Sequence, residues 1–185
     1  MILVVDSGAG GIAVREHILV NTGYSAEDIV LHLDTPNFPY GNKTVEFLQQ
    51  RYDAFVAQFQ PDLTVIACNT MSLSVKDVER QLKVLPRLNP GDILLGSMLT
   101  CMSMNTGIPC SDLIADIQDY HESRVSKQTL KLRITQKLEP IAAGSSVYLG
   151  CTHFSYCSNL FAEARSDINF IEPNYAELTI AALSK

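Results

Sequence analysis

The chain has 185 residues, of which 46% are hydrophobic and 18% charged, and its formal net charge is −6. This composition is typical of one globular domain or two small ones, not of a disordered chain. The negative balance argues against a nucleic-acid partner, because such binding depends on clustered lysine and arginine. No apolar run approaches the ~20 residues that a membrane span needs, so we expect no membrane association either.

Residues 1–6 lack the basic start of a signal peptide and predict a first strand. The five cysteines are an odd number, with no CxxC pattern and no spacing typical of a zinc site. We therefore expect a cytoplasmic protein with free thiols and no bound metal. Cys101, Cys110 and Cys157 are expected to pack as small hydrophobic residues.

Apolar runs and turn residues divide the chain into alternating strands and helices. In the first half we expect strands at residues 2–5, 28–33 and 63–67, and helices at 12–18, 44–59 and 71–85. A break at 86–91 precedes strands at 92–96, 147–149 and 168–171 and helices at 112–120, 126–138, 154–165 and 174–183. This alternation predicts an α/β protein with parallel sheets.

A glycine-rich turn follows the first strand and carries Asp6 and Ser7 at its start. It is neither a GxGxxG motif nor a phosphate-binding P-loop, so a nucleotide site is only weakly indicated. A carboxylate here would repel a phosphate, but it could accept a proton or bind an ammonium group. The alternative is that Asp6 or Ser7 only caps the following helix.

Two cysteines occupy equivalent places, each directly after an apolar strand and before small polar residues. Cys68 precedes Asn69 and Thr70, and Cys151 precedes Thr152 and His153. Ligands of open α/β sheets bind at the carboxyl ends of the strands, which makes both cysteines candidates for one site. A helix N-terminus beside each thiol is expected to lower its pKa toward neutrality.

Three chemistries compete for this pair of thiols. A covalent nucleophile with His153 as its base would need one cysteine, as in amidases. Redox exchange would favour a CxxC pattern and would not need Asn69, Thr70 and Thr152. In proton transfer, one thiol removes a proton and the other returns one from the opposite face. Two equivalent thiols, with Asp6 in one half and His153 in the other as helpers, fit proton transfer best.

Four motifs then occur in the order found in glutamate racemases, of the cofactor-independent aspartate/glutamate racemase superfamily. They are Asp6-Ser7-Gly8, Pro39-Tyr40-Gly41, Cys68-Asn69-Thr70 and Cys151-Thr152-His153. The resemblance covers residues 2–85 and residues 147 to the C-terminus. The histidine after Cys151-Thr152 resembles the glutamate branch, because aspartate racemases tend to carry an acidic residue there.

The resemblance implies two pseudo-symmetric α/β subdomains with the active-site cleft between them, formed by residues 1–87 plus 155–185 and by residues 88–154. It implies that Cys68 acts on D-glutamate with help from Asp6, and Cys151 on L-glutamate with help from His153, without a cofactor. The substrate would be held by Ser7, Pro39, Tyr40, Gly41, Asn69, Thr70, Ser97, Thr100 and Thr152. The product would supply peptidoglycan synthesis, and the family's habit of dimerising allows a homodimer.

The chain departs from the family between residues 85 and 109, where a strand and a helix are replaced by residues 86–90 and the second subdomain is truncated. Ser97 stands where the family has threonine, and the glutamate that helps the histidine falls near Gln118 or Asp119. Two further hypotheses follow. The chain could be a racemase-like protein inactivated by internal deletion that acts as a binding or interaction module, or a cysteine hydrolase on an α/β scaffold.

Overall fold

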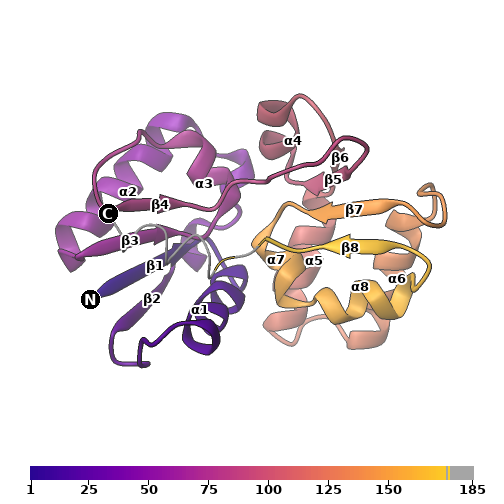
Figure 1. The fold of residues 1–185 in the computed structure, drawn as a ribbon, viewed down its shortest axis with the longest axis horizontal. Helices are drawn as coiled ribbons and strands as arrows, with labels where there is room; N and C mark the ends of the chain where they lie inside the picture. Colours follow the sequence, from indigo (N-terminus) through magenta and orange to yellow (C-terminus); the bar gives the residue numbers. More distant parts are fainter. Residues whose placement is uncertain (174, 176–185) are drawn as a thin grey trace.

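The computed structural model describes residues 1–173 and 175 and contains two four-stranded parallel sheets (Figure 1). The first has the order β2-β1-β3-β4 and is formed by β1 (Ile2–Asp6), β2 (Ile29–Leu33), β3 (Leu63–Ile66) and β4 (Gln81–Lys83). The second has the order β6-β5-β7-β8 and is formed by β5 (Ile93–Gly96), β6 (Ile108–Pro109), β7 (Ser146–Leu149) and β8 (Asn169–Ile171). The predicted α/β fold with two parallel sheets is confirmed.

The first sheet is covered on both faces, which explains why residues 2–5 of β1 are all apolar. Ile2 and Val4 pack with the buried side of α1 (Gly10–Asn21), whereas Leu3 and Val5 pack with α2 (Val45–Phe59). The Thr44 side chain caps α2 by accepting a hydrogen bond from the backbone N–H of Phe47. Two short 3₁₀ turns, Thr35–Asn37 and Tyr40–Asn42, join β2 to α2.

The helix predicted at residues 71–85 is wrong beyond its first turn. The helix α3 spans only Asn69–Ser74, and the chain then returns as β4, which pairs in parallel with β3. Pairing with β3 satisfies one side of the backbone of this edge strand and buries Leu82 at 6% exposure, while Val78, within the predicted helix, is 50% exposed. Tertiary pairing therefore overrides a weak helical period.

The second half contains α4 (Met98–Met104), α5 (Ser111–His121), α6 (Lys127–Leu138), α7 (Thr152–Tyr156) and α8 (Ser158–Ala164). Residues from α5, α6 and α8 form one core against the second sheet; among them are Leu113, Ile117, Leu130, Ile134 and Phe161. The helix predicted at 154–165 is divided at Cys157 into α7 and α8. The irregular connection at residues 84–92 joins the sheets (Figure 1).

The subdomain boundary expected at residue 155 differs from the division of the sheets. The strand β8 pairs with β7, and Leu160, Phe161 and Ile168 belong to the second core. The physical reason is that α8 forms a short crossover between two neighbouring parallel strands. Tyr175 packs in the first half's core, and the helix predicted at 174–183 otherwise lies outside the described residues.

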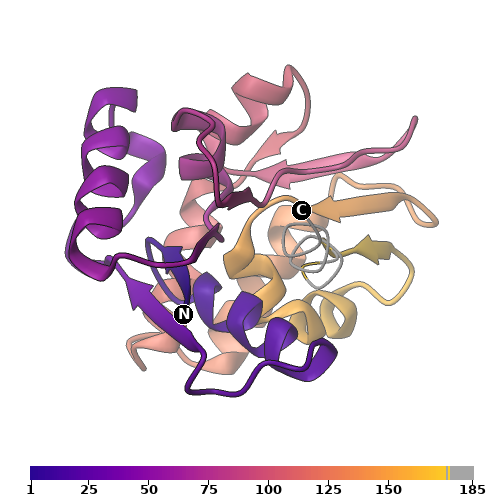
Figure 2. The same cartoon turned by 60° about the vertical axis from the view of Figure 1, so that its left-hand side comes forward.

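The two halves meet closely where α1 contacts α7 (Figure 2). Glycines make this approach possible: a methyl group at Gly10 would lie 2.3 Å from Thr152 Oγ1, and one at Gly8 would lie 2.4 Å from Gln118 Oε1. The carboxyl end of β1 is therefore held against the second half. Among the described helices, none has the length and apolar character to cross a membrane.

Candidate active site

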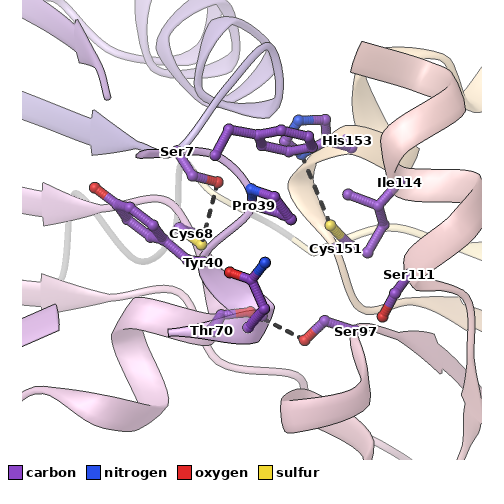
Figure 3. A pocket seen from close by; sticks show the side chains of 13 residues that line it. Ser7, Pro39, Tyr40, Cys68, Thr70, Ser97, Ser111, Ile114, Cys151 and His153 are labelled. Atoms are coloured by element: carbon purple, nitrogen blue, oxygen red, sulfur yellow. Dashed lines mark hydrogen bonds between the residues drawn. The ribbon is translucent and has the colours of Figure 1, made fainter. Parts of the chain in front are cut away.

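A cavity of about 220 Å³ lies between the two halves and contains both candidate cysteines (Figure 3). This volume is below the ~300 Å³ at which pockets for drug-sized ligands begin, so it suits a small metabolite. The lining residues come from both halves: Ser7, Phe38, Pro39, Tyr40, Gly41, Asn42, Cys68, Thr70, Ser97, Ser111, Ile114, Cys151 and His153. The two thiols face the cavity from opposite sides, each from the carboxyl end of a strand.

Cys68 forms the first half's side of the cavity. It follows β3 at the start of α3, and its Sγ lies 3.9 Å from Ser7 Oγ. Burial, followed by the negative charge of Asp6, raises the pKa of the thiol to about 12, although the backbone N–H groups of Met71 and Thr70 oppose the rise. The expectation of a lowered thiol pKa is therefore wrong, because burial outweighs the helix N-terminus.

Cys151 forms the opposite side, at the start of α7. Its Sγ lies 3.9 Å from Nδ1 of His153. Burial and the neighbouring Cys68 raise the pKa of the Cys151 thiol well above its ordinary value, against the lowering effect of the His153 backbone N–H. Burial lowers the pKa of His153 to about 3, so its ring is neutral near neutral pH. Phe38 packs beside this ring, with centroids 5.3 Å apart.

Asp6 and Thr152 do not line the cavity but join its two sides from behind. Asp6 Oδ1 accepts a hydrogen bond from the backbone N–H of Gly8 at 3.0 Å, and its Oδ2 accepts one from the Thr152 hydroxyl at 2.9 Å. Burial raises the pKa of Asp6 to about 7, against these lowering hydrogen bonds. The carboxyl group can therefore hold or release a proton near neutral pH.

The pKa of Asp6 is raised and that of His153 is lowered, and these opposite shifts predict opposing effects of pH on stability. The pKa of Asp6 rises from 3.8 to about 7 on folding, so its contribution to the unfolding free energy falls as pH rises across that interval. The pKa of His153 falls from 6.5 to about 3, so its contribution rises with pH over nearly the same interval.

Asp6→Asn should therefore remove the contribution to the unfolding free energy that falls with pH and leave the rising contribution of His153. Relative to wild type, the variant should gain unfolding free energy on the order of 4 kcal/mol between about pH 4 and about pH 8. Urea unfolding curves of both proteins at a series of pH values measure this difference. An unchanged difference between the two proteins across the series would contradict the raised pKa of Asp6.

Tyr40 lines the cavity with its ring, while its hydroxyl points away from the cysteines (Figure 3). That hydroxyl donates to Asp34 at 2.6 Å, and Arg51 binds both oxygens of the same carboxylate at 3.0 and 2.8 Å. Asp34 is 3% exposed. The network anchors the wall formed by residues 38–42, so Tyr40 acts here through the position of its backbone and ring.

A chain of hydroxyl groups connects the two halves beside the cavity. Thr70 Oγ1 lies 3.0 Å from Ser97 Oγ, which lies 2.9 Å from Thr100 Oγ1. Thr100 is buried behind Ser97 and does not line the cavity. Asn69 also lies behind the lining, where its Nδ2 donates to the Val84 carbonyl at 2.9 Å; its Oδ1 has no hydrogen-bond partner among the described residues.

Four further lining residues, contributed by α5 and by the loop before α2, were not predicted from the sequence. They are Phe38, Asn42, Ser111 and Ile114. Ser111 and Ile114 are three residues apart and so share a helix face, but only the arrangement of the two sheets shows that this face meets the cysteines. Behind the lining, Gln118 lies 3.1 Å from His153, whereas Asp119 pairs with Arg124.

Among the described residues that line the cavity, none is a lysine or arginine. Within residues 1–173 and 175, no group of three or more His, Cys, Asp or Glu side chains could hold a metal ion. The polar groups available to a ligand are thus hydroxyls, amides, thiols and a neutral imidazole.

Comparison with known proteins gives one consistent answer. Over an alignment of 209 positions including gaps, the chain is 25% identical to a glutamate racemase of Buchnera aphidicola; the alignment covers 92% of this chain and 79% of that protein. It is 28% identical over 194 residues to a glutamate racemase of Sodalis glossinidius, covering 85% of this chain but only 65% of that protein.

The fold of the chain shows the same similarity as its sequence. The structure superimposes on Escherichia coli glutamate racemase, solved with L-glutamate and an activator, with a TM-score of 0.79 at 22% identity; the match covers 99% of this chain and 82% of that one. No family model matches the chain. The chain is therefore similar to glutamate racemases in sequence and in fold, and it is shorter than they are.

Proposed function

We propose that the protein is an isomerase that interconverts L- and D-glutamate by proton transfer between two cysteines, and that it supplies D-glutamate for peptidoglycan. The observation that carries this proposal is a single small cavity with Cys68 and Cys151 on opposite sides. Racemisation needs a base on one face of the α-carbon and an acid on the other, which is what two facing thiols provide. The relatives' names supply the substrate.

In the direction from L to D, Cys151 as the thiolate takes the α-proton of L-glutamate. The carbon–hydrogen bond breaks, a sulfur–hydrogen bond forms, and the electron pair stays on the substrate as a carbanion. Cys68 as the thiol then donates its proton to the opposite face and becomes a thiolate. The reverse reaction begins at Cys68, with Asp6 behind it as the group that titrates near neutral pH.

Neutral donors must hold the substrate, because no lining residue is a lysine or arginine. We assign this role to lining hydroxyls and nearby backbone N–H groups, with Ser7, Thr70 and Ser97 contributing hydroxyls. Preorganised donors around the α-carboxylate would stabilise the carbanion without a cofactor. Asn69, Thr100 and Thr152 would support these groups from behind, and Pro39, Tyr40 and Gly41 would shape the wall.

Hydrogen exchange tests the proposal directly. The folded protein is incubated in deuterated water with L-glutamate and, separately, with D-glutamate, and loss of the α-proton signal is followed by NMR. We expect exchange and racemisation from both enantiomers. Absence of exchange from both would reject the enzyme and favour the inactivated binding module. A substrate-dependent covalent adduct on one cysteine, found by mass spectrometry, would instead favour a hydrolase.

A further inference from the structure

Gln118, on α5, is a buried side chain that the proposed proton transfer does not yet use. It is 2% exposed and lies beside His153, which is also 2% exposed. Its Oε1 accepts a hydrogen bond from the backbone N–H of Ala9 at 2.9 Å and lies 3.1 Å from His153 Nε2. Its Nε2 donates to Glu122 Oε1 at 2.7 Å.

These contacts fix which end of the Gln118 amide faces the histidine. A backbone N–H can only donate, so the amide atom that faces Ala9 is the oxygen. A carboxylate can only accept, so the atom that faces Glu122 is the amide nitrogen. The amide is therefore held in one orientation by a partner at each end, and its oxygen faces His153.

The orientation of the amide determines where the histidine carries its hydrogen. The oxygen of Gln118 has only lone pairs to offer, so His153 Nε2 must donate to it. A neutral imidazole has one N–H, and the other nitrogen then carries a lone pair. That nitrogen is Nδ1, which lies 3.9 Å from Cys151 Sγ.

We propose that Gln118 is a positioning residue that locks His153 in the Nε2–H tautomer and thereby makes Nδ1 the acceptor of the Cys151 proton. The proposal rests on the proposed function. The sulfur–hydrogen bond of Cys151 breaks, the proton forms a nitrogen–hydrogen bond at Nδ1 of His153, and the sulfur keeps the electron pair as a thiolate. After one turnover, His153 loses this proton to solvent and the Cys68 thiolate gains one.

The lock also couples the two halves. The oxygen that holds His153 is the one bound by the N–H of Ala9, at the turn after β1. Gly8 leaves room for it, since a methyl group there would lie 2.4 Å from Oε1 and 2.8 Å from His153 Nε2. The tautomer at Cys151 thus depends on contact with the first half.

Nitrogen-15 NMR of the full chain tests the lock without reference to activity. The ring nitrogens of His153 are assigned by the loss of their signals in His153→Gln. We expect Nε2 to show the shift of a protonated nitrogen and Nδ1 that of an unprotonated one. In Gln118→Met both tautomers should appear, because the methionine gives Nε2 no comparable acceptor. The Nδ1–H form in wild type would overturn the proposal.

Two variants keep the test decisive if Gln118→Met does not fold. Gln118→Glu, made together with Glu122→Gln so that an amide still faces residue 118, retains an acceptor and should keep the Nε2–H form, while its negative charge should raise the pKa of His153 in an NMR titration. Glu122→Gln is the matched control, because it retains an oxygen for the amide nitrogen of Gln118 and should leave the His153 signals unchanged. A switch to the Nδ1–H form in Gln118→Glu would refute the lock.

The catalytic consequence of the tautomer lock is tested by α-proton exchange in variants that keep only one of the two cavity cysteines. In Cys68→Ala, adding Gln118→Met should slow α-proton exchange of L-glutamate about 10- to 100-fold. In Cys151→Ala, the same addition should leave exchange of D-glutamate within about twofold. Equal losses on both sides would show a general structural effect and contradict the positioning role. If neither enantiomer exchanges in wild type, the proposed function fails, whereas the NMR spectrum still decides the lock.

Discussion

Alanine at either Cys68 or Cys151 should abolish racemisation, with a loss of about 10³-fold or more in kcat for both directions. In the proposed mechanism each thiol serves one face of the α-carbon, and the two side chains lie on opposite sides of the cavity. Loss of one leaves a face without a thiol, because the described lining residues include no other cysteine. Polarimetry or a chiral separation of the two glutamates measures the effect.

Cys101→Ala is the matched control, since it removes a buried thiol that does not line the cavity. It should keep racemase activity within a few-fold while losing some stability. Full racemisation by Cys68→Ala or by Cys151→Ala would refute the two-thiol mechanism. Loss of racemisation in all three variants would point to a stability effect, which circular dichroism of each variant would reveal.

Gly10→Ala should separate the two halves and inactivate the protein. The added methyl would lie 2.3 Å from Thr152 Oγ1 and 2.7 Å from the backbone nitrogen of His153, and the backbone cannot move away without shifting α7. Alanine gains about 1 kcal/mol of helix propensity, but overpacking of this kind typically costs ~1–3 kcal/mol, and more against a rigid backbone. We expect a net loss of about 2 kcal/mol in the unfolding free energy.

Urea unfolding and the racemase assay measure the two consequences of Gly10→Ala. Gly23→Ala is the matched control, because nothing lies within 4 Å of a methyl group there. The control should unfold at the same urea concentration as wild type and keep its activity. If Gly10→Ala also behaved as wild type, the close junction between α1 and α7 would not exist in solution.

The positions of the two cysteines could be predicted because local signals determine them. An apolar run followed by small polar residues predicts a buried parallel strand and a turn, and parallel strands bring their carboxyl ends to one edge. Cys68 and Cys151 both lie at such ends, and both line the cavity. The pattern of strand, cysteine and small polar residues that occurs twice in the sequence thus corresponds to two equivalent sites in the structure, with one thiol at the end of each sheet.

Features that depend on long-range packing were not accessible from the sequence. The edge strand β4 lies within residues 71–85, which the sequence pattern predicted as a helix, and only pairing with β3 decides its state. Gln118 and Asp119 are neighbours on one helix, and the contact with His153 singles out the first. The thiol pKa shifts depend on how completely the two halves enclose the pocket, which no local pattern reports.

The absence of lysine and arginine from the lining has a consequence for substrate capture. The proposed substrate, glutamate, carries a net negative charge at neutral pH, and the formal net charge of this protein is also negative, at −6. Long-range attraction therefore does not speed the encounter, in contrast to sites where a cationic funnel raises the association rate. The ligand must arrive by unassisted diffusion against a weak repulsion, which dissolved ions screen over a distance of about 10 Å at 0.1 M ionic strength.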